Sequence, residues 1–304
     1  MIDWLTRGSL ARQRRIAFFV FLLPWMLGFV LWTAGPMLAS LGLSLTTYDA
    51  IAPPHFVGLQ NYASMFSSML TWQSLKATSI YTFGAVGVTV IASLLLATLL
   101  NQRLPLLSVW RTVYYLPVVT SGVAVSLLWW WIFQPDYGLV NSMLWSLLHI
   151  HGPAWFFSVH WVLPAFIIMA LWGLGGPMLI YLAAMQGVPT QLYDAASIDG
   201  AGWWRRYFHI TLPMISPAIL FNAVLSVIGS FQVFTPAYVI TQGGPNYASY
   251  FYVFNIYEQA FVNFRFGEAS ALAWLLFVII LVVTIVILRT SSVWVYYEEG
   301  GGRI

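Results

Sequence analysis

Residues Leu192 to Pro213 read LYDAASIDGAGWWRRYFHITLP and separate two long apolar stretches of a 304-residue chain. The segment places two aspartates and two arginines close together in a chain of which only 7% of the residues are charged. An average soluble domain has roughly 25% charged residues. A membrane protein has little reason to keep such a segment unless something outside the membrane binds it.

The overall composition indicates a bilayer protein, since 60% of the residues are hydrophobic. The net charge of +3 then bears on orientation in the membrane and not on nucleic-acid binding. The chain contains no cysteine, which excludes a disulfide framework, thiol catalysis and a thiolate metal site.

Six apolar stretches are long enough to cross the hydrocarbon core as helices of about 20 residues. Because these runs are continuous and do not alternate, they favour helices over barrel strands. The apolar run that follows the N-terminal arginines is too long for a signal peptide and is interpreted as a retained first span. We predict an all-α polytopic membrane protein with spans at about 16–43, 77–101, 112–133, 160–184, 214–240 and 268–289.

The distribution of basic residues predicts the orientation. If the N-terminus is cytoplasmic, only Lys76 and Arg265 of the twelve basic residues lie outside. The ten on the inside are Arg7, Arg12, Arg14, Arg15, Arg103, Arg111, Arg205, Arg206, Arg289 and Arg303. This bias predicts an N-in, C-in topology with a basic N-terminus at 1–15 and a cytoplasmic tail at 290–304. The loop at about 186–213 then lies in the cytoplasm.

The spans lack the residues of a self-sufficient pump. Of the nine carboxylates, only Glu268 borders a span, which argues against an intramembrane ion relay. The single lysine, Lys76, follows no glycine-rich loop, so the chain has no phosphate-binding loop for ATP. His149 and His151 are a weak metal signal and are interpreted as ordinary loop histidines. Energy for active transport would have to come from another polypeptide.

The quoted segment predicts a short helix at about 190–199. Pro189 suits the start of a helix, Thr190 can cap free amides, and Gly200 can end the helix in a left-handed conformation. A helix this short is not stable alone, so it should pack on something. Ala195 and Ala196 leave part of its surface bare. On physical grounds, a docking element and an amphipathic interhelical loop both fit.

The spacing of this segment resembles a known signature. Asp194-Ala195-Ala196, three residues, Gly200, nine residues, Ile210, one residue and Leu212-Pro213 resemble the cytoplasmic EAA signature of binding-protein-dependent ABC importer permeases. Here Asp194 stands where the family usually has glutamate. Over about residues 16–289, further stretches resemble the carbohydrate-class, maltose-type members: FVGLQNY (56–62), YYLPVVTSG (114–122), PDYGLVN (135–141) and FQVFTPAYVITQGGP (231–245).

The resemblance implies a type I ABC importer permease fold at 16–289 in the cytoplasmic membrane of a bacterium or archaeon. It implies a heterodimer with a second permease, two ATPase subunits that bind ATP and Mg, and an extracytoplasmic solute-binding protein. The chain itself would be a transport subunit without enzymatic activity, cofactor or metal. The EAA helix would be the coupling helix, and the residues expected to contact the ATPase are Leu192, Tyr193, Asp194, Ala195, Ala196, Asp199, Gly200 and Ala201.

Two spans combine small and polar residues. LWGLGGP (171–177) should kink or unwind the fourth span, and a stripe of small and polar residues at intervals of three or four follows the fifth. Close helix packing would explain both patterns. The resemblance implies that both spans line the solute cavity, through Gly173, Gly176, Ser226, Gly229, Ser230, Gln232 and Val233.

The resemblance implies a sugar or oligosaccharide as the solute. Because no arginine or lysine is expected in the middle of a span, a neutral sugar is favoured over a sugar phosphate or glycerol phosphate. The alternatives are an ABC permease for a non-sugar solute, such as a polyol or glycerol phosphate, and an ion-coupled secondary carrier.

Overall fold

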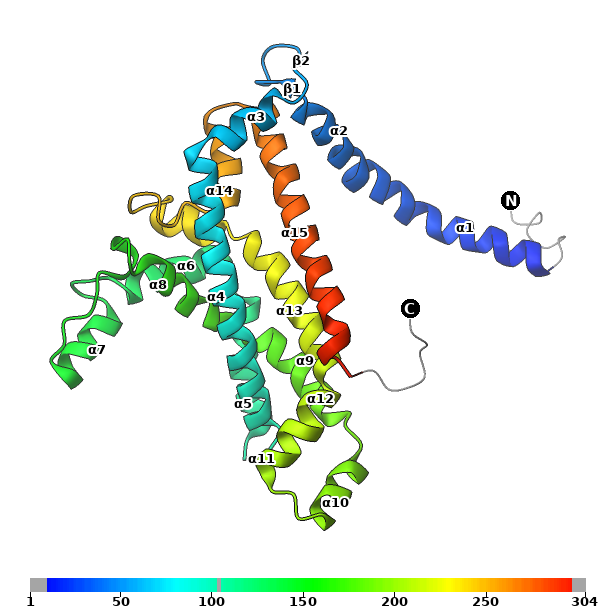
Figure 1. Cartoon of the computed structure of the whole chain (residues 1–304), viewed down its shortest axis with the longest axis vertical. Helices are drawn as coiled ribbons and strands as arrows, with labels where there is room; N and C mark the ends of the chain where they lie inside the picture. Colours follow the sequence, from blue (N-terminus) through cyan, green and yellow to red (C-terminus); the bar gives the residue numbers. More distant parts are fainter. Residues whose placement is uncertain (1–9, 103–104, 297–304) are drawn as a thin grey trace. The chain divides into compact units, whose positions relative to one another are not determined.

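The computed structural model describes residues 10–102 and 105–296, and most of these residues are helical (Figure 1). The α-helices are α1 (Leu10–Phe29), α2 (Gly35–Ser44), α3 (Gln60–Ser67), α4 (Met69–Leu100), α5 (Leu107–Tyr115), α6 (Gly122–Ile132), α7 (Leu139–Leu148), α8 (Val162–Ala170), α9 (Gly175–Gln186), α10 (Thr190–Ile198), α11 (Trp203–Arg206), α12 (Leu212–Met214), α13 (Ser216–Phe231), α14 (Tyr252–Tyr257) and α15 (Phe266–Trp294). Two short strands, β1 (Thr46–Thr47) and β2 (His55–Phe56), pair antiparallel. The all-α prediction is confirmed. The predicted tails lie largely outside the described residues, as do Arg7, Arg103 and Arg303.

The described chain holds enough apolar helix for the six predicted spans. Three helices are individually long and apolar enough to cross a bilayer: Arg14–Ser44, Met69–Leu100 and Phe266–Trp294. Three further pairs pass the same test together but are bent: Leu107–Val119 with Gly122–Ile132, Val162–Gly173 with Gly175–Gln186, and Trp203–Met214 with Ser216–Phe231. Six spans result when each bent pair counts as one.

The third span, predicted at about 112–133, is broken into two helices, a break that the sequence did not indicate. Its two helices meet at an angle of 102°. The chain forms a tight turn there, in which both the amide and the hydroxyl of Thr120 donate to the Pro117 carbonyl. Thr120 and Ser121 then adopt extended backbone, which ends the helical hydrogen bonding. A prediction from the length of the apolar run cannot detect this turn, because most of the turn residues are themselves apolar.

The fifth span was placed at 214–240, but helix α13 ends at Phe231. Gln232, Val233 and Phe234 lie outside helix, and a short helical segment resumes at Thr235, where Pro236 in the first turn leaves no helical bond unmade. At the other end the helical segment begins already at Trp203 and bends by 64° before Ser216. Val233 therefore lies beyond the helix and not on its stripe.

The kink predicted in the fourth span is confirmed. The helix bends by 50° between Val162–Gly173 and Gly175–Gln186. Pro177 sits in the first turn of α9, where its missing amide hydrogen leaves no helical bond unmade. Gly175 has a separate role, since a Cβ atom on it would lie 2.2 Å from the Tyr114 carbonyl oxygen. Only glycine lets α9 approach α5 this closely.

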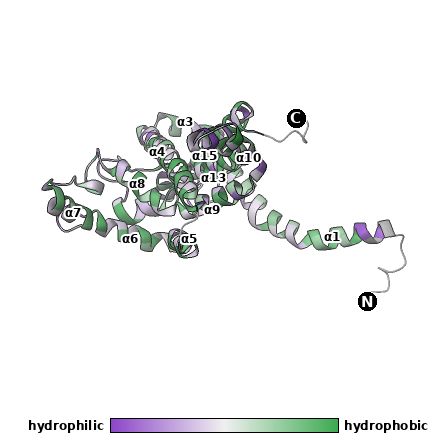
Figure 2. Cartoon of the chain, turned by 90° about the horizontal axis from the view of Figure 1, so that it is seen from below, coloured by the Kyte–Doolittle hydropathy of each residue, from purple (hydrophilic) through white to green (hydrophobic). Residues whose placement is uncertain are grey.

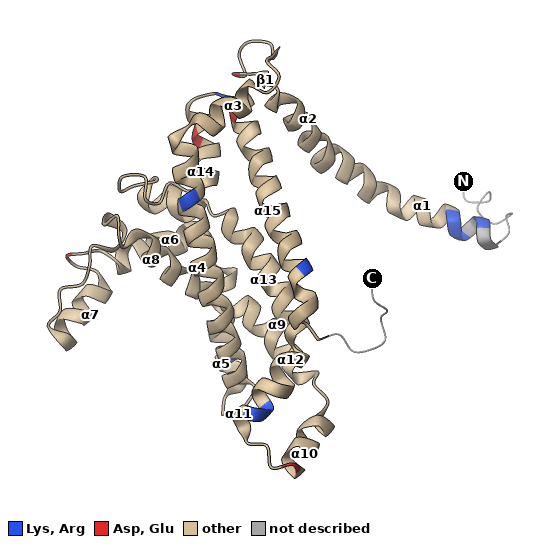
Figure 3. Cartoon of the chain, viewed as in Figure 1, with Lys and Arg blue, Asp and Glu red and all other residues tan. Residues whose placement is uncertain are grey.

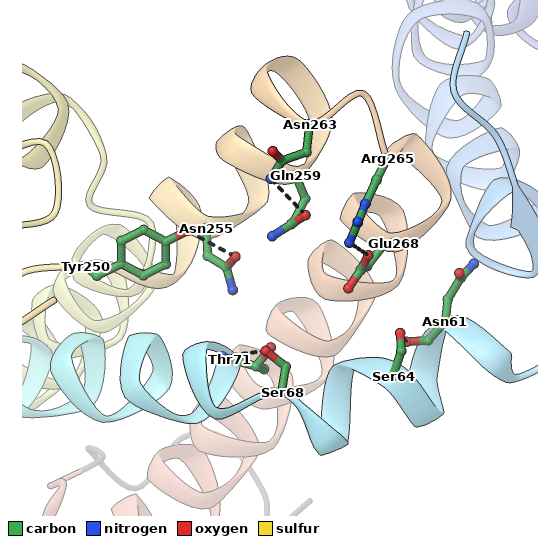
Figure 4. A network of polar contacts seen from close by, with 10 residues as sticks. All are labelled: Asn61, Ser64, Ser68, Thr71, Tyr250, Asn255, Gln259, Asn263, Arg265 and Glu268. Carbon is green, nitrogen blue, oxygen red and sulfur yellow. Dashed lines mark hydrogen bonds and ion pairs between the residues drawn. The ribbon is translucent and has the colours of Figure 1, made fainter. Parts of the chain in front are cut away.

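The chain divides into two compact units, of which the smaller contains residues up to Met65 together with Gln259–Trp274. Its centre is Asn61, whose amide nitrogen donates to the carbonyls of Ser44 and Thr46, both at 2.8 Å. Arg265 and Glu268 form an ion pair of 3.4 Å at the start of α15 (Figure 4). The two Asn61 bonds hold the end of α2 and strand β1 against α3 in this unit.

The larger unit contains Phe66–Glu258 and the chain from Leu275 onward. Helix α4 packs against α8, α9 and α13 within it. Two buried apolar clusters hold these helices together, one around Phe133 and Phe166 and the other around Leu100 and Tyr181. Hydrophobic colour also covers much of the outer helix faces (Figure 2). Such exposed apolar faces are what lipid contact requires.

Candidate functional site

Helix α10 is ended by the glycine that the sequence predicts. Gly200 has a φ of +73°, in the left-handed region. The Gly200 amide donates to the Ser197 carbonyl at 3.1 Å, and the Ala201 amide donates to the Ala196 carbonyl at 2.8 Å. This pair of bonds is a Schellman motif, which satisfies the last helical carbonyls. The predicted left-handed end of the helix is confirmed.

The start of α10 differs from the prediction. Pro189, with a ψ of 128°, is the residue before the helix, and Thr190 is the first helical residue. No side chain caps this end. Thr190 as a cap is therefore wrong, because a residue inside the first turn does not have the extended backbone of a capping residue.

Helix α10 leaves much of its surface open. Leu192, Asp194, Ala195, Asp199 and Gly200 are exposed, whereas Tyr193, Ala196 and Ala201 are half-buried. Within residues 10–102 and 105–296, neither aspartate side chain has a hydrogen bond or an ion pair. Acidic colour marks α10 and basic colour marks α11 beside it (Figure 3).

Ile198 is a residue that sequence reasoning missed. It is 87% exposed, although it is a large apolar side chain on a helix. The sequence signal for its exposure was its position between Ala196 and Gly200 in the predicted docking helix, next to the acidic Asp199. With the two unpaired carboxylates, it gives α10 an apolar and acidic surface of the kind that a partner protein covers.

Two hydrogen bonds tie α10 to the segment that follows it. The hydroxyls of Tyr193 and Thr211 lie 2.9 Å apart. The Arg206 guanidinium donates from Nη1 to the Ser197 hydroxyl at 3.0 Å. The Tyr193 ring also packs against the buried cluster around Leu100. These contacts supply the packing that so short a helix needs.

A second region is a cavity of ≈530 Å³ in the larger unit. Its lining residues are Tyr81, Ala85, Thr89, Ala170, Gly173, Pro177, Ser226, Gly229, Ser230, Val233, Phe234, Thr235 and Pro236. Five of the seven predicted solute-path residues are thus brought together: Gly173, Ser226, Gly229, Ser230 and Val233. The other two, Gly176 and Gln232, are not in the lining. Whether the five contact solute stays a prediction.

Sequence reasoning missed the contribution of α4 to this cavity. Tyr81 and Thr89 come from α4, and no solute role was predicted for any residue of that helix. The available signal was the series of small hydroxyl residues along α4, of which Thr71, Ser74, Thr78, Thr82 and Ser93 are buried. Such residues let helices approach closely, so they mark the inward face of α4.

A second hollow of ≈380 Å³ adjoins the cavity through shared residues, among them Tyr81 and Gly173. It extends to Pro117, Thr120 and Gly122, where the third span bends. Irregular backbone at membrane depth is tolerated where it lines a cavity, because water or a ligand can then satisfy the freed polar groups. The bent third and fourth spans are explained in this way.

The chemistry of the cavity follows from its side chains. No lining residue carries a charge, and hydroxyl groups come from Tyr81, Thr89, Ser226, Ser230 and Thr235. Membrane hydroxyls commonly donate back to their own helix. Thr89 does so, donating to the Ala85 carbonyl at 2.7 Å. In the part of the chain that the structure describes, the Ser226 and Ser230 hydroxyls have no hydrogen-bond partner. Both hydroxyls are open to a ligand.

Comparison with known proteins gives consistent results. The chain matches the model of the family "Binding-protein-dependent transport system inner membrane component" over residues 89–296. It is 37% identical to the probable ABC transporter permease protein YesP of Bacillus subtilis, over 98% of this chain and 97% of that protein. It is 33% identical to the lactose transport system permease protein LacF of Rhizobium radiobacter, over 92% and 94% of the two chains.

The fold has a close counterpart in a solved structure. A chain of the bacterial alginate ABC transporter, crystallised in complex with an alginate pentasaccharide-bound periplasmic protein, superposes with a TM-score of 0.81 at 23% identity. The match covers 92% of this chain and 95% of that one. The family match spans more than half of the sequence and includes both α10 and the cavity-lining α13. The chain therefore belongs to the family of inner membrane components of binding-protein-dependent transport systems.

Proposed function

We propose that this chain is the permease subunit of an ATP-driven importer for a neutral sugar or oligosaccharide. The observation that carries the solute class is the pair of unpartnered hydroxyls, Ser226 and Ser230, in an uncharged cavity that also contains Tyr81 and Phe234. Hydroxyls suit the polar edge of a sugar, and aromatic rings suit its apolar face. The lactose permease among the relatives supports the same class.

A charged solute fits this cavity poorly. A phosphate or carboxylate removed from water needs a cationic partner or several donors to offset its lost hydration. The lining offers neither a lysine nor an arginine. The uncharged lining therefore favours a neutral sugar or polyol over a glycerol phosphate.

The proposed energy source is a pair of ATPase subunits that dock on α10. Three features support this: the unpaired Asp194 and Asp199, the exposed Ile198, and the tether that connects α10 to the rest of the larger unit. The arginine bias supports an N-in, C-in topology with α10 in the cytoplasm. ATP and Mg would bind to the ATPases and not to this chain.

The remaining proposed partners are a second permease and an extracytoplasmic solute-binding protein. The family match supports a binding protein, and the alginate transporter was crystallised with a periplasmic protein. A second permease would cover part of the open cavity and complete the solute path.

Reconstitution of the complete transporter tests the proposal. Changing both Ser226 and Ser230 to alanine removes two hydrogen bonds at about 1 kcal/mol each, so the KM for solute should rise about tenfold or more. Solute affinity of the separate binding protein should not change. Leu225→Ala, at an exposed neighbouring position outside the cavity lining, is the control. Uptake by this chain alone, driven by an ion gradient, would contradict the proposal.

A further inference from the structure

A third cavity, of ≈280 Å³, lies beside α10 and belongs neither to the solute cavity nor to the exposed face of α10. It is formed where the end of α4, the end of α9, α10 and α11 meet. Its lining residues are Thr98, Asn101, Gln102, Met185, Tyr193, Trp203, Arg206, Tyr207 and Thr211.

The lining of this cavity is rich in hydrogen-bond donors. Arg206 carries a permanent positive charge, Asn101 and Gln102 offer amide N–H groups, and no lining residue is acidic. Neither amide side chain has a hydrogen-bond partner among the described residues. Arg206 gives one N–H to Ser197, which leaves further N–H groups on its guanidinium. Such a set of donors suits a phosphate-bearing anion.

The surroundings of the cavity indicate where such an anion would come from. Trp203, Trp204 and Phe208 are each about half-exposed or more, and they form an aromatic surface next to the cavity. Tryptophan is enriched at the boundary between lipid and water. Under the proposed topology this boundary is the cytoplasmic one, where anionic phospholipids create a negative surface potential.

The residues that line this cavity are also those that hold α10. Arg206 donates to Ser197, and Tyr193 pairs with Thr211, so three lining residues make both tethering bonds. An anion that draws Arg206 toward the cavity would compete with the bond to Ser197. An anion bound in the cavity would therefore increase the mobility of α10.

We propose that this cavity binds a phosphate-bearing anion through Arg206, Asn101 and Gln102, and that binding loosens the tether of α10. The favoured source is the headgroup of an anionic phospholipid of the cytoplasmic leaflet. A free phosphate compound has the same chemistry and is distinguished in the test. The inference rests on the proposed function for the cytoplasmic location of α10, but binding and local motion are measurable without ATPase activity.

The test uses the full chain with its partner subunits in nanodiscs of phosphatidylcholine, with or without phosphatidylglycerol. Because the chain contains no cysteine, Gln191→Cys provides a single site on this chain for a spin label, at an exposed position of α10 outside the residues expected to contact the ATPase. The partner subunits are made cysteine-free. The two readouts are the mobility of this label and the amount of phosphatidylglycerol that the purified complex retains. Inorganic phosphate added to phosphatidylcholine nanodiscs tests the soluble source.

Arg206→Gln and Arg205→Gln are matched variants. Both remove one positive charge from the same helix, but Arg205 is exposed and does not line the cavity. Phosphatidylglycerol should increase label mobility in the parent and in Arg205→Gln. In Arg206→Gln its retention should fall about tenfold, and its effect on mobility should disappear. Ser197→Ala should raise mobility without added anion, because it removes one of the two tethering hydrogen bonds and leaves the cavity lining unchanged.

The remaining outcomes are also decisive. A response to inorganic phosphate in phosphatidylcholine that Arg206→Gln abolishes would support the site and assign it to a soluble anion. Equal loss in both arginine variants would show a general effect of surface charge and would overturn the proposal. A label insensitive to both anions in the parent would overturn it as well. If the parent complex in the same nanodiscs shows no ATPase stimulation by the loaded binding protein but keeps its anion response, the result would instead count against the proposed function.

Discussion

Gly200→Ala is the sharpest test of the role of α10, because it changes one backbone preference and little else. A Cβ atom at Gly200 would have no heavy atom within 4 Å outside its own chain neighbours, so the substitution causes no clash. The φ of +73° is the only obstacle. A residue with a Cβ atom pays roughly 1–2 kcal/mol for the left-handed conformation.

This cost falls on the end of α10. A penalty of 1–2 kcal/mol lowers the population of the native turn by a factor of roughly 5–30 relative to competing conformations. The two bonds that close the helix, from Gly200 to Ser197 and from Ala201 to Ala196, are lost in those conformations. Asp199 would then be displaced, while the buried clusters of the larger unit would stay intact. We expect a large loss of function with little loss of thermal stability.

The assay is the initial rate of solute uptake into vesicles that contain the complete transporter, together with ATPase stimulation by the loaded binding protein. Gly202→Ala is the matched control, since Gly202 has a φ of −69° and equally open surroundings. Gly200→Asn should be intermediate, because asparagine tolerates the left-handed region better than alanine. Normal coupling in Gly200→Ala, or equal defects in Gly200→Ala and Gly202→Ala, would refute the reasoning.

Three further substitutions test other parts of the structure. Ser230→Leu should block solute passage by filling the cavity while the ATPases stay bound, whereas Gln232→Leu, outside the lining, should transport normally; loss of assembly in Ser230→Leu would favour a packing role. Gly175→Ala should lower the melting temperature of the purified protein, since its Cβ atom would lie 2.2 Å from the Tyr114 carbonyl oxygen and such overpacking costs about 1–3 kcal/mol. Gly176→Ala is the control, because its Cβ atom would have no heavy atom within 4 Å and the substitution should be tolerated. Tyr193→Phe removes the hydrogen bond to Thr211, worth about 1 kcal/mol, and amide exchange in α10 should quicken about fivefold; unchanged exchange would show that ring packing alone holds the helix.

The elements that sequence reasoning located are those determined by local chemistry. A run of apolar residues long enough to cross the bilayer is a property of the run itself, so all six spans were found. Gly200 was identified for the same reason, because a glycine just after a short helical segment is a local signal for a left-handed end. The spacing of the EAA-like signature also lies within one short segment.

The elements that sequence reasoning missed depend on distant or backbone-level features. The stripe along the fifth span was extended to Val233 with helical phase, and Gln232 was placed beside it, but the helix ends at Phe231. Val233 nevertheless lines the cavity and Gln232 does not, which helical phase cannot decide beyond the end of the helix. Tyr81 and Thr89 were missed because the small hydroxyl residues of α4 indicate only which face is inward, and the neighbouring helices determine which part of that face borders the cavity.

The breaks in the spans differ in what surrounds them, and this separates two structural roles. At Thr120, at Gly173 and at Val233, the chain leaves regular helix beside the two adjoining hollows, which these residues help to line. Polar backbone groups freed there can be satisfied by water or solute, so irregular backbone is tolerated because the cavity exists. The break at Ile215 is different, since Ile215 is 1% exposed and packs in the cluster around Leu100 and Tyr181.

The bend at Ile215 therefore lies in a packed core and not beside a cavity; Pro217 cannot donate to the Pro213 carbonyl, which accepts from the Ser216 hydroxyl instead. The bend connects α13, which carries Ser226 and Ser230, to the segment that tethers α10 through Thr211 and Arg206. A bend held in a close-packed core transmits a displacement instead of absorbing it, because such a core deforms little. A displacement of α10 would thus be passed through the bend at Ile215 to Ser226 and Ser230. The irregular segments beside the cavity are the places where the backbone can change conformation.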